Sequence, residues 1–155
     1  ALGVINCYEI ASSSKRIDAI VFGIFDLLND MQIEYTKGNP FGGKYSRYKV
    51  PVAAAAAGVA AIDGIWQEIK DEKGLENDCK LGKELGYSGK SIIHPDQIKI
   101  THKIFYPNSS EISWSKSVVK EYEKSTKKGK GAIVIDGKMI DEVHYKRAKS
   151  LLEII

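Results

Sequence analysis

Four polar or turn-forming residues stand where short apolar runs of the sequence end. They are Asp26, Asp63, His94 and Pro95. Carboxylate oxygens suit a hard divalent cation such as Mg²⁺, which takes one or two protein carboxylates and completes its shell with water and substrate. The sequence contains neither a nucleophile elbow nor a phosphate-binding glycine loop. These residue types therefore predict a metal-assisted reaction.

Two of the aspartates also have a structural interpretation. Asp26 precedes LLNDM and Asp63 precedes GIWQEI, and an aspartate in either place suits the N-cap of a helix. Histidine and cysteine offer no competing metal site, because the three histidines lack zinc-site spacing and the two cysteines are far apart.

Three apolar runs predict the strands that position these side chains: DAIVFG at 18–23, GVAAID at 58–63 and GKSIIHP at 89–95. Their continuous apolar character predicts burial on both faces. The segments between them, 45–58 and 65–86, read as helices that end at glycines. This alternation is typical of parallel βαβ units, whose strands meet at one edge by their carboxyl ends. The polar residues are expected together at that rim.

Further elements flank this βαβ core. They are expected at 3–14 (helix), 35–44 (exposed glycine-rich loop), 95–105 (helix with proline in its first turn), 108–129 (helix with Ser110 as N-cap), 132–136 (strand) and 139–155 (amphipathic helix).

Composition is that of an ordinary globular protein. The 155 residues are 43% hydrophobic and 28% charged, with a net charge of +3. The longest apolar stretch is short and rich in alanine, so no membrane span is expected, and the start of the chain does not read as a signal peptide. Two separated cysteines favour a reducing, cytoplasmic setting, and the lysines near residue 127 are those of a solvated helix end rather than a nucleic-acid site.

Three stretches resemble the citrate lyase beta-subunit-like branch of the aldolase/citrate lyase superfamily, which includes malyl-CoA and citramalyl-CoA lyases. They are VFGIFDLLNDM, AAIDGIWQEIKDEKGLENDCKLGKELGYSGKSIIHPDQI and GAIVIDGKMID. The resemblance implies an α/β fold: the C-terminal half of a (β/α)₈ TIM barrel at 1–106, followed by a helical C-terminal extension, or lid, at 107–155.

The resemblance also implies an activity. A Mg²⁺-dependent lyase of this kind cleaves a 3-hydroxyacyl-CoA, or an acyl-carrier thioester, into acetyl-CoA and a 2-oxoacid. Thioester hydrolysis, a free-acid aldolase reaction and a non-catalytic acyl-CoA-binding module are the alternatives. A homo-oligomer, a trimer or hexamer that exchanges its lids, is the implied assembly.

Site residues follow from the matched motifs. Asp26 matches the family's metal-binding aspartate, whereas Asp63, His94 and Pro95 match positions that line its pocket. Asp141 matches the acid carried on the lid, which in relatives closes over a neighbouring subunit's site. The alternative for Asp141 is a structural acid at the start of the last helix.

A complete barrel of this type needs roughly 250 residues. The resemblance places a second metal ligand, a glutamate, immediately before Ala1. A fragment of a longer protein is the favoured explanation, and a split barrel completed by a second chain or a remodelled non-catalytic remnant are the alternatives.

Overall fold

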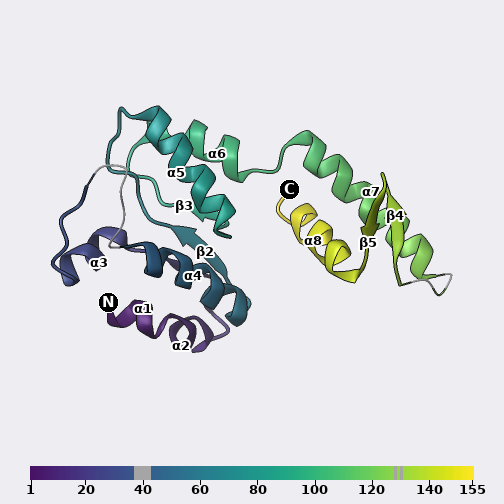
Figure 1. Ribbon diagram of the computed structural model, residues 1–155, viewed down its shortest axis with the longest axis horizontal. Coiled ribbons are helices and arrows are strands. Elements are labelled where there is room, and N and C mark those ends of the chain that lie inside the picture. The colour runs from purple at the N-terminus through teal and green to yellow at the C-terminus, as the bar shows by residue number, and fades with distance from the viewer. Residues whose placement is uncertain (37–42, 128, 130) are drawn as a thin grey trace. The chain divides into compact units, whose positions relative to one another are not determined.

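The computed structural model describes residues 1–36, 43–127, 129 and 131–155, and the chain divides into two compact units, 1–105 and 106–155 (Figure 1). The boundary lies one residue from the one expected. Most of the loop expected at 35–44 lies outside the described residues.

A three-stranded parallel sheet forms the centre of the first unit. Its strands are β1 (Ala19–Val21), β2 (Ala60–Asp63) and β3 (Gly89–Lys90), in that spatial order. Ala19 pairs with Ala60, and Ile62 pairs with Gly89. The parallel arrangement predicted from the alternating pattern is confirmed. The third strand is shorter than expected, because it ends at Lys90 instead of continuing to residue 95.

Helices connect and cover these strands (Figure 1). In chain order they are α1 (Leu2–Ile5), α2 (Cys7–Ser12), α3 (Ile24–Asp30), α4 (Lys44–Ala57), α5 (Glu72–Glu84), the 3₁₀ turn η2 (Pro95–Gln97) and α6 (Ile98–Phe105). The alanine-rich α4 ends as predicted at Gly58, whose φ of 74° is left-handed. Helix α5 begins later than predicted, because the Asp71 side chain accepts a hydrogen bond from the Gly74 backbone and so caps it.

Two hydrophobic clusters form the core of this unit: one packs α3 and α4 against the sheet, and the other joins Trp66, Leu75 and Cys79 to α6. Phe22 and Ala61 are 3% exposed and pack with Leu27, Val50 and other apolar residues of α3 and α4. Val21, the next residue along β1, is 62% exposed. The prediction that all three strands are buried on both faces is therefore wrong for β1 in the described structure, because successive side chains point to opposite faces of the sheet.

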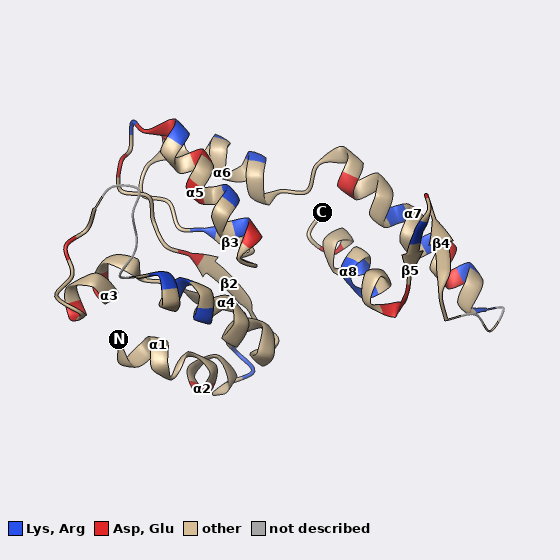
Figure 2. Ribbon diagram, viewed as in Figure 1, with Lys and Arg blue, Asp and Glu red and all other residues tan. Residues whose placement is uncertain are grey.

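The second unit is a helix pair with a hairpin between its members. It contains α7 (Ser109–Thr126), the antiparallel strands β4 (Ile133–Ile135) and β5 (Lys138–Ile140), and α8 (Glu142–Leu152). Its core is formed by Val118, Tyr122, Ile140 and Ala148. Acidic and basic residues are interspersed along α7 (Figure 2).

One expectation for this unit is wrong and another is incomplete. The N-cap of α7 is Asn108, not Ser110, because the Asn108 side chain accepts from the Glu111 backbone while the Glu111 carboxylate accepts from the Asn108 backbone. The strand predicted at 132–136 is confirmed as β4, but β5 pairs with it in a hairpin that has positive φ at both turn residues, Asp136 and Gly137, so the last helix begins at Glu142 instead of 139. Among the described residues, no helix combines the length and apolar character needed to cross a bilayer.

Candidate functional site

Asp26 lies in the first turn of α3, directly beyond the carboxyl end of β1. Gly23 is the N-cap of this helix, so the alternative interpretation of Asp26 as an N-cap is wrong. A Cβ atom on Gly23 would lie 2.9 Å from the Asp26 Oδ2, so a larger residue there would make the carboxylate shift. Asp26 is exposed, and no hydrogen bond or ion pair with a described residue engages its carboxylate.

A cavity of about 610 Å³ adjoins Asp26 and is lined by α1, β1 and α3. Ala1, Gly23 and Asp30 belong to the same lining. No group of three or more metal-binding side chains occurs in the described part of the chain. One free carboxylate nevertheless fits Mg²⁺, since that ion uses one or two protein carboxylates and retains several waters.

Asp63 is the last residue of β2 and is buried, at 1% exposure. Arg47, from α4, donates through Nε to Asp63 Oδ1 at 3.0 Å and through Nη2 to Oδ2 at 2.5 Å. Lys90, from β3, donates to Oδ2 at 3.0 Å. No helix begins at the residue after Asp63, so the interpretation of Asp63 as an N-cap is wrong. Its oxygens are instead committed to two buried cations.

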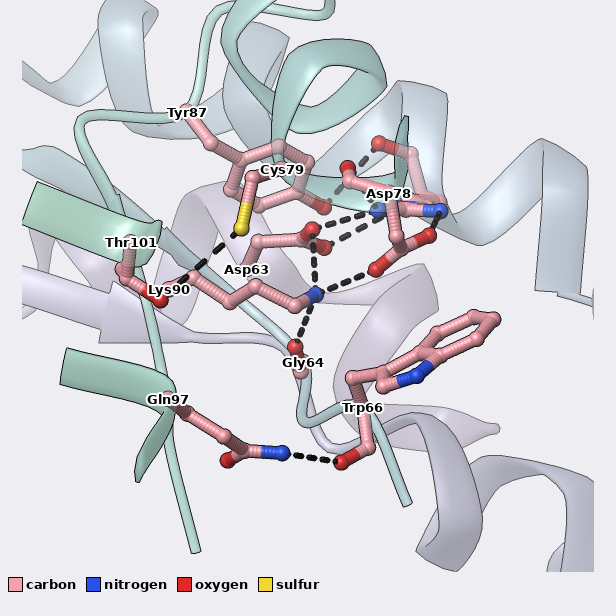
Figure 3. Close-up of polar contacts among 10 residues, drawn as sticks. Asp63, Gly64, Trp66, Asp78, Cys79, Tyr87, Lys90, Gln97 and Thr101 are labelled. Atoms are coloured by element: carbon pink, nitrogen blue, oxygen red, sulfur yellow. Dashed lines mark hydrogen bonds and ion pairs between the residues drawn. The ribbon is translucent and has the colours of Figure 1, made fainter. Parts of the chain in front are cut away.

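Asp78, from α5, completes a four-residue charge network with Asp63, Arg47 and Lys90 (Figure 3). It accepts from Arg47 Nη1 at 2.8 Å and from Lys90 Nζ at 2.5 Å. Lys90 Nζ also donates to the Gly64 carbonyl at 2.5 Å. Two cations face two carboxylates, so the network is neutral, which is the condition under which buried charges are tolerated.

The network also fixes the protonation state of its arginine. Burial disfavours the Arg47 charge, but hydrogen bonds and attraction to Asp63 and then Asp78 outweigh it and raise the guanidinium pKa. The Tyr87 hydroxyl donates to the Arg47 carbonyl at 3.0 Å, and burial raises the pKa of that phenol. The ends of β2 and β3 are thus joined to α4 and α5 by charge-assisted hydrogen bonds.

A second cavity, of about 260 Å³, lies beside this network. Its apolar wall is formed by Phe22, Ile24, Tyr35, Ile65, Trp66 and Leu81. All four residues of the charge network contribute to its lining. The Trp66 Nε1 is buried and has no hydrogen-bond partner among the residues that the structure describes. The cavity therefore combines an apolar wall with fixed polar groups, as small-molecule sites do.

His94 and Pro95 form the start of η2 rather than the end of β3. The His94 Nδ1 accepts from the Asp96 backbone at 3.2 Å, and its ring is 41% exposed. The buried Gln97 side chain anchors this turn, because it bonds both to the Ile93 backbone and to the Trp66 carbonyl. Among the described residues, no hydrogen bond or ion pair joins His94 to the other predicted site residues.

Asp141 is the N-cap of α8, in the second unit. Its Oδ1 accepts from the backbone of Val143 at 3.0 Å and of His144 at 3.3 Å, and it lies 2.7 Å from the His144 Nδ1. These bonds, that of the His144 side chain first, lower the pKa of the Asp141 carboxyl. Asp141 therefore has the structural role that was its alternative, at the start of the last helix. Its catalytic role stays a prediction.

The residues that sequence reasoning missed are Arg47, Asp78, Lys90 and Trp66. The first three lie in segments correctly expected to be helices or a strand. A signal was available for Lys90, which stands in a short buried strand one residue after a glycine. A cation in that place requires a buried counter-charge, and Asp63 in the neighbouring strand was the available one.

The three-stranded parallel sheet and the helices that cover it define an α/β fold. The sequence pattern of the HpcH/HpaI aldolase/citrate lyase family matches residues 1–95, and the chain belongs to that family. It is 35% identical over 156 residues to the citrate lyase subunit beta of Leuconostoc mesenteroides subsp. cremoris, covering 99% of this chain and 51% of that protein. A (3S)-malyl-CoA thioesterase of Cereibacter sphaeroides is 32% identical, over 98% of this chain and 53% of that protein.

Solved structures show the same fold. CitE from Mycobacterium tuberculosis, in complex with magnesium, acetoacetate and coenzyme A, superposes with a TM-score of 0.74 at 23% identity, over 97% of this chain and 56% of that one. A citrate lyase from Burkholderia xenovorans LB400 gives a TM-score of 0.78 at 20% identity, over 98% of this chain and 49% of that one. The chain spans about half the length of the curated relatives it matches.

Proposed function

We propose that this chain is the C-terminal barrel half and lid of a Mg²⁺-dependent lyase. The enzyme cleaves a 3-hydroxyacyl thioester of the malyl-, citramalyl- or citryl-CoA type into acetyl-CoA and a 2-oxoacid. Family membership supports the reaction class. The observation that carries the proposal is the unpaired, exposed carboxylate of Asp26 beside a cavity at the carboxyl end of β1.

Asp26 is the residue of this chain that would hold the metal ion. The family resemblance expects its partner ligand, a glutamate, immediately before Ala1, and Ala1 lines the same cavity as Asp26. When bound, Mg²⁺ supplies Lewis-acid polarisation of the oxygens of the departing 2-oxoacid. Magnesium in the Mycobacterium tuberculosis CitE complex supports this assignment.

Asp63 serves this site by holding the ends of β2 and β3 in place. Its bonds to Arg47 and Lys90 fix the backbone at Gly64, where the polypeptide turns away from the sheet. Asp63 is also a pocket residue in this proposal, because it helps to line the 260 Å³ cavity. His94 and Pro95, which line neither described cavity, would take part in the pocket of the complete barrel as a turn that exposes an ionisable ring near the end of β3.

The reaction breaks the bond between the α-carbon of the thioester and the carbinol carbon, while the carbinol hydroxyl gives up its proton to a base of the complete site and becomes the carbonyl of the 2-oxoacid. The electron pair stays on the α-carbon as a thioester enolate, which then takes up a proton. Asp141 serves that proton transfer from the C-terminal unit of a neighbouring subunit in a homo-oligomer, a trimer or hexamer. Closure of such a segment would exclude water from the site.

Thioester hydrolysis is the second candidate reaction. The observation in its favour is the (3S)-malyl-CoA thioesterase of Cereibacter sphaeroides, which is about as similar to this chain as the citrate lyase subunits are. In that reaction the malyl carbon skeleton stays intact and water takes the acyl group. The products separate the two reactions: acetyl-CoA with glyoxylate for the lyase, malate with free CoA for the thioesterase.

The experiment is a product assay on the complete protein with malyl-CoA, citramalyl-CoA and citryl-CoA, with and without Mg²⁺. Asp26→Asn is compared with Asp18→Asn, a matched change of an exposed carboxylate just before the other end of β1 and outside both cavities. We expect Mg²⁺-dependent cleavage that Asp26→Asn abolishes and Asp18→Asn retains. Equal turnover in Asp26→Asn and wild type would remove Asp26 from the metal site. No turnover on any of the three thioesters by the folded protein would refute the lyase assignment.

A further inference from the structure

Gly23 stands between β1 and α3, and the backbone on both sides of it is held in place. The Phe22 N–H donates to the Ile62 carbonyl at 2.9 Å, which continues the contact of β1 with β2. The Gly23 carbonyl accepts from the Leu27 N–H at 3.1 Å and so begins α3. Phe22 and Leu27 are themselves buried in the core. A movement of the Gly23 Cα would therefore strain backbone hydrogen bonds and core packing together.

The backbone conformation does not explain why this residue is glycine. Its φ of −85° and ψ of 83° lie in a region that residues with side chains also adopt. Capping does not explain it either, because serine, asparagine and aspartate are better N-caps than glycine. What a side chain at Gly23 would meet first is the Asp26 carboxylate. An added Cβ would lie 2.9 Å from Oδ2 but 3.8 Å from the Asp26 Cβ and Cγ, so only the outer oxygen would be too close.

The Asp26 carboxylate has no other restraint in the described structure. Asp26 is the third residue of α3, from which an acidic side chain can reach back to the N–H of the N-cap residue and complete a capping box. Among the described residues, neither that hydrogen bond nor an ion pair engages it. Rotation of a carboxylate about its last bond is only weakly restricted. The space left by Gly23 therefore decides which orientations Oδ2 can take.

We propose that Gly23 is a positioning residue for the metal site, because its lack of a side chain lets the Asp26 carboxylate take the orientation that binds Mg²⁺. Mg²⁺ tolerates little change in ligand geometry, since it requires a nearly ideal octahedron with bonds of about 2.0–2.1 Å. Gly23 and Asp26 line the same 610 Å³ cavity. The assignment rests on the proposed function, in which Asp26 holds the metal ion, and adds the residue that sets the direction of its carboxylate.

The test measures the affinity of the complete protein for Mg²⁺ by calorimetric titration, without substrate. Gly23→Ala and Gly23→Ser both add a Cβ, and serine is also a strong N-cap, so it preserves the start of α3. We expect the Kd for Mg²⁺ to rise about 10–100-fold in both variants. The thermal stability of Gly23→Ser should stay close to that of the wild type. Gly131→Ala, whose Cβ would meet nothing within 4 Å, is the control and should keep the wild-type Kd.

A second comparison shows whether Gly23 acts through Asp26. Asp26→Asn should itself weaken Mg²⁺ binding, and adding Gly23→Ser to it should cause no further loss, because no carboxylate remains to be displaced. A wild-type Kd in Gly23→Ser would overturn the role of Gly23, and so would an equal rise in both backgrounds. Asp26 would remain the metal ligand in either case. A wild-type Kd in Asp26→Asn would instead refute the metal assignment, and the role of Gly23 with it.

Discussion

The buried charge network permits a quantitative prediction for Lys90→Met. Methionine keeps the length and apolar stem of the side chain but removes the ammonium group, which donates to Asp63, Asp78 and Gly64. The two cations and two carboxylates become one cation and two carboxylates. Removing one member of a buried ion pair costs about 3–5 kcal/mol. We therefore expect the free energy of unfolding to fall by about that amount, a large share of the roughly 5–15 kcal/mol typical of a domain.

Equilibrium denaturation in urea, followed by circular dichroism, measures this change. Lys80→Met is the matched control, because Lys80 forms an exposed pair with Glu76 on α5 at 2.6 Å and should be nearly neutral. Adding Asp78→Asn to Lys90→Met leaves one guanidinium facing one carboxylate. Part of the lost stability should therefore return in the double variant. The reasoning fails if Lys90→Met is no more destabilising than Lys80→Met, or if the second change adds its own full penalty.

Two further predictions concern local structure. Gly82→Ala on α5 should lower the free energy of unfolding by about 1–3 kcal/mol, because the added Cβ would lie 2.8 Å from the Asp63 Oδ2. Thermal denaturation measures this change. The control is Gly3→Ala on α1, whose Cβ would meet nothing within 4 Å and which should be neutral or mildly stabilising. The Asp141 cap should depend on pH, because its carboxyl pKa is lowered in the folded protein. Its contribution is fully present above the ordinary carboxyl pKa and is lost as the pH falls through the lowered one. The check is the amide protection factor at the start of α8, that is, exchange corrected for its intrinsic pH dependence. It should fall on acidification in the wild type but not in Asp141→Asn, and the same fall in both proteins would contradict the prediction.

The sequence supplied the order and type of the main elements of the first unit. Continuous apolar runs and the alanine-rich segment ending at Gly58 were sufficient for the βαβ arrangement. Exact ends were harder to predict, because side-chain hydrogen bonds decide them. Asn108 and Asp71 cap α7 and α5, whereas a residue that merely belongs to a capping type, such as Ser110, does not. The hairpin at Asp136 and Gly137 was missed because Met139 and Ile140, which lie in its second strand, were assigned to the amphipathic helix expected at 139–155.

The candidate site was predicted in part. Asp26 and Asp63 were singled out as strand-end carboxylates, and the structure places both at the ends of adjacent strands. Their opposite environments, one exposed and unpaired and the other buried between two cations, depend on α4 and α5 packing against the sheet. Residue spacing does not determine which side chains of those helices reach Asp63. Tertiary packing therefore decided the environments of the two aspartates.

The neutrality of the charge network has a consequence for how this sequence can diverge. Its four members come from α4, β2, α5 and β3, so they lie far apart in the sequence but share one balance of charge. Replacing any one of the four residues leaves one buried charge without its partner. A well-packed apolar set of similar volume can nevertheless be as stable as the four ions. The route from one arrangement to the other passes through unstable intermediates. Homologous sequences should therefore show these four positions changing together, as a covarying set, more often than singly.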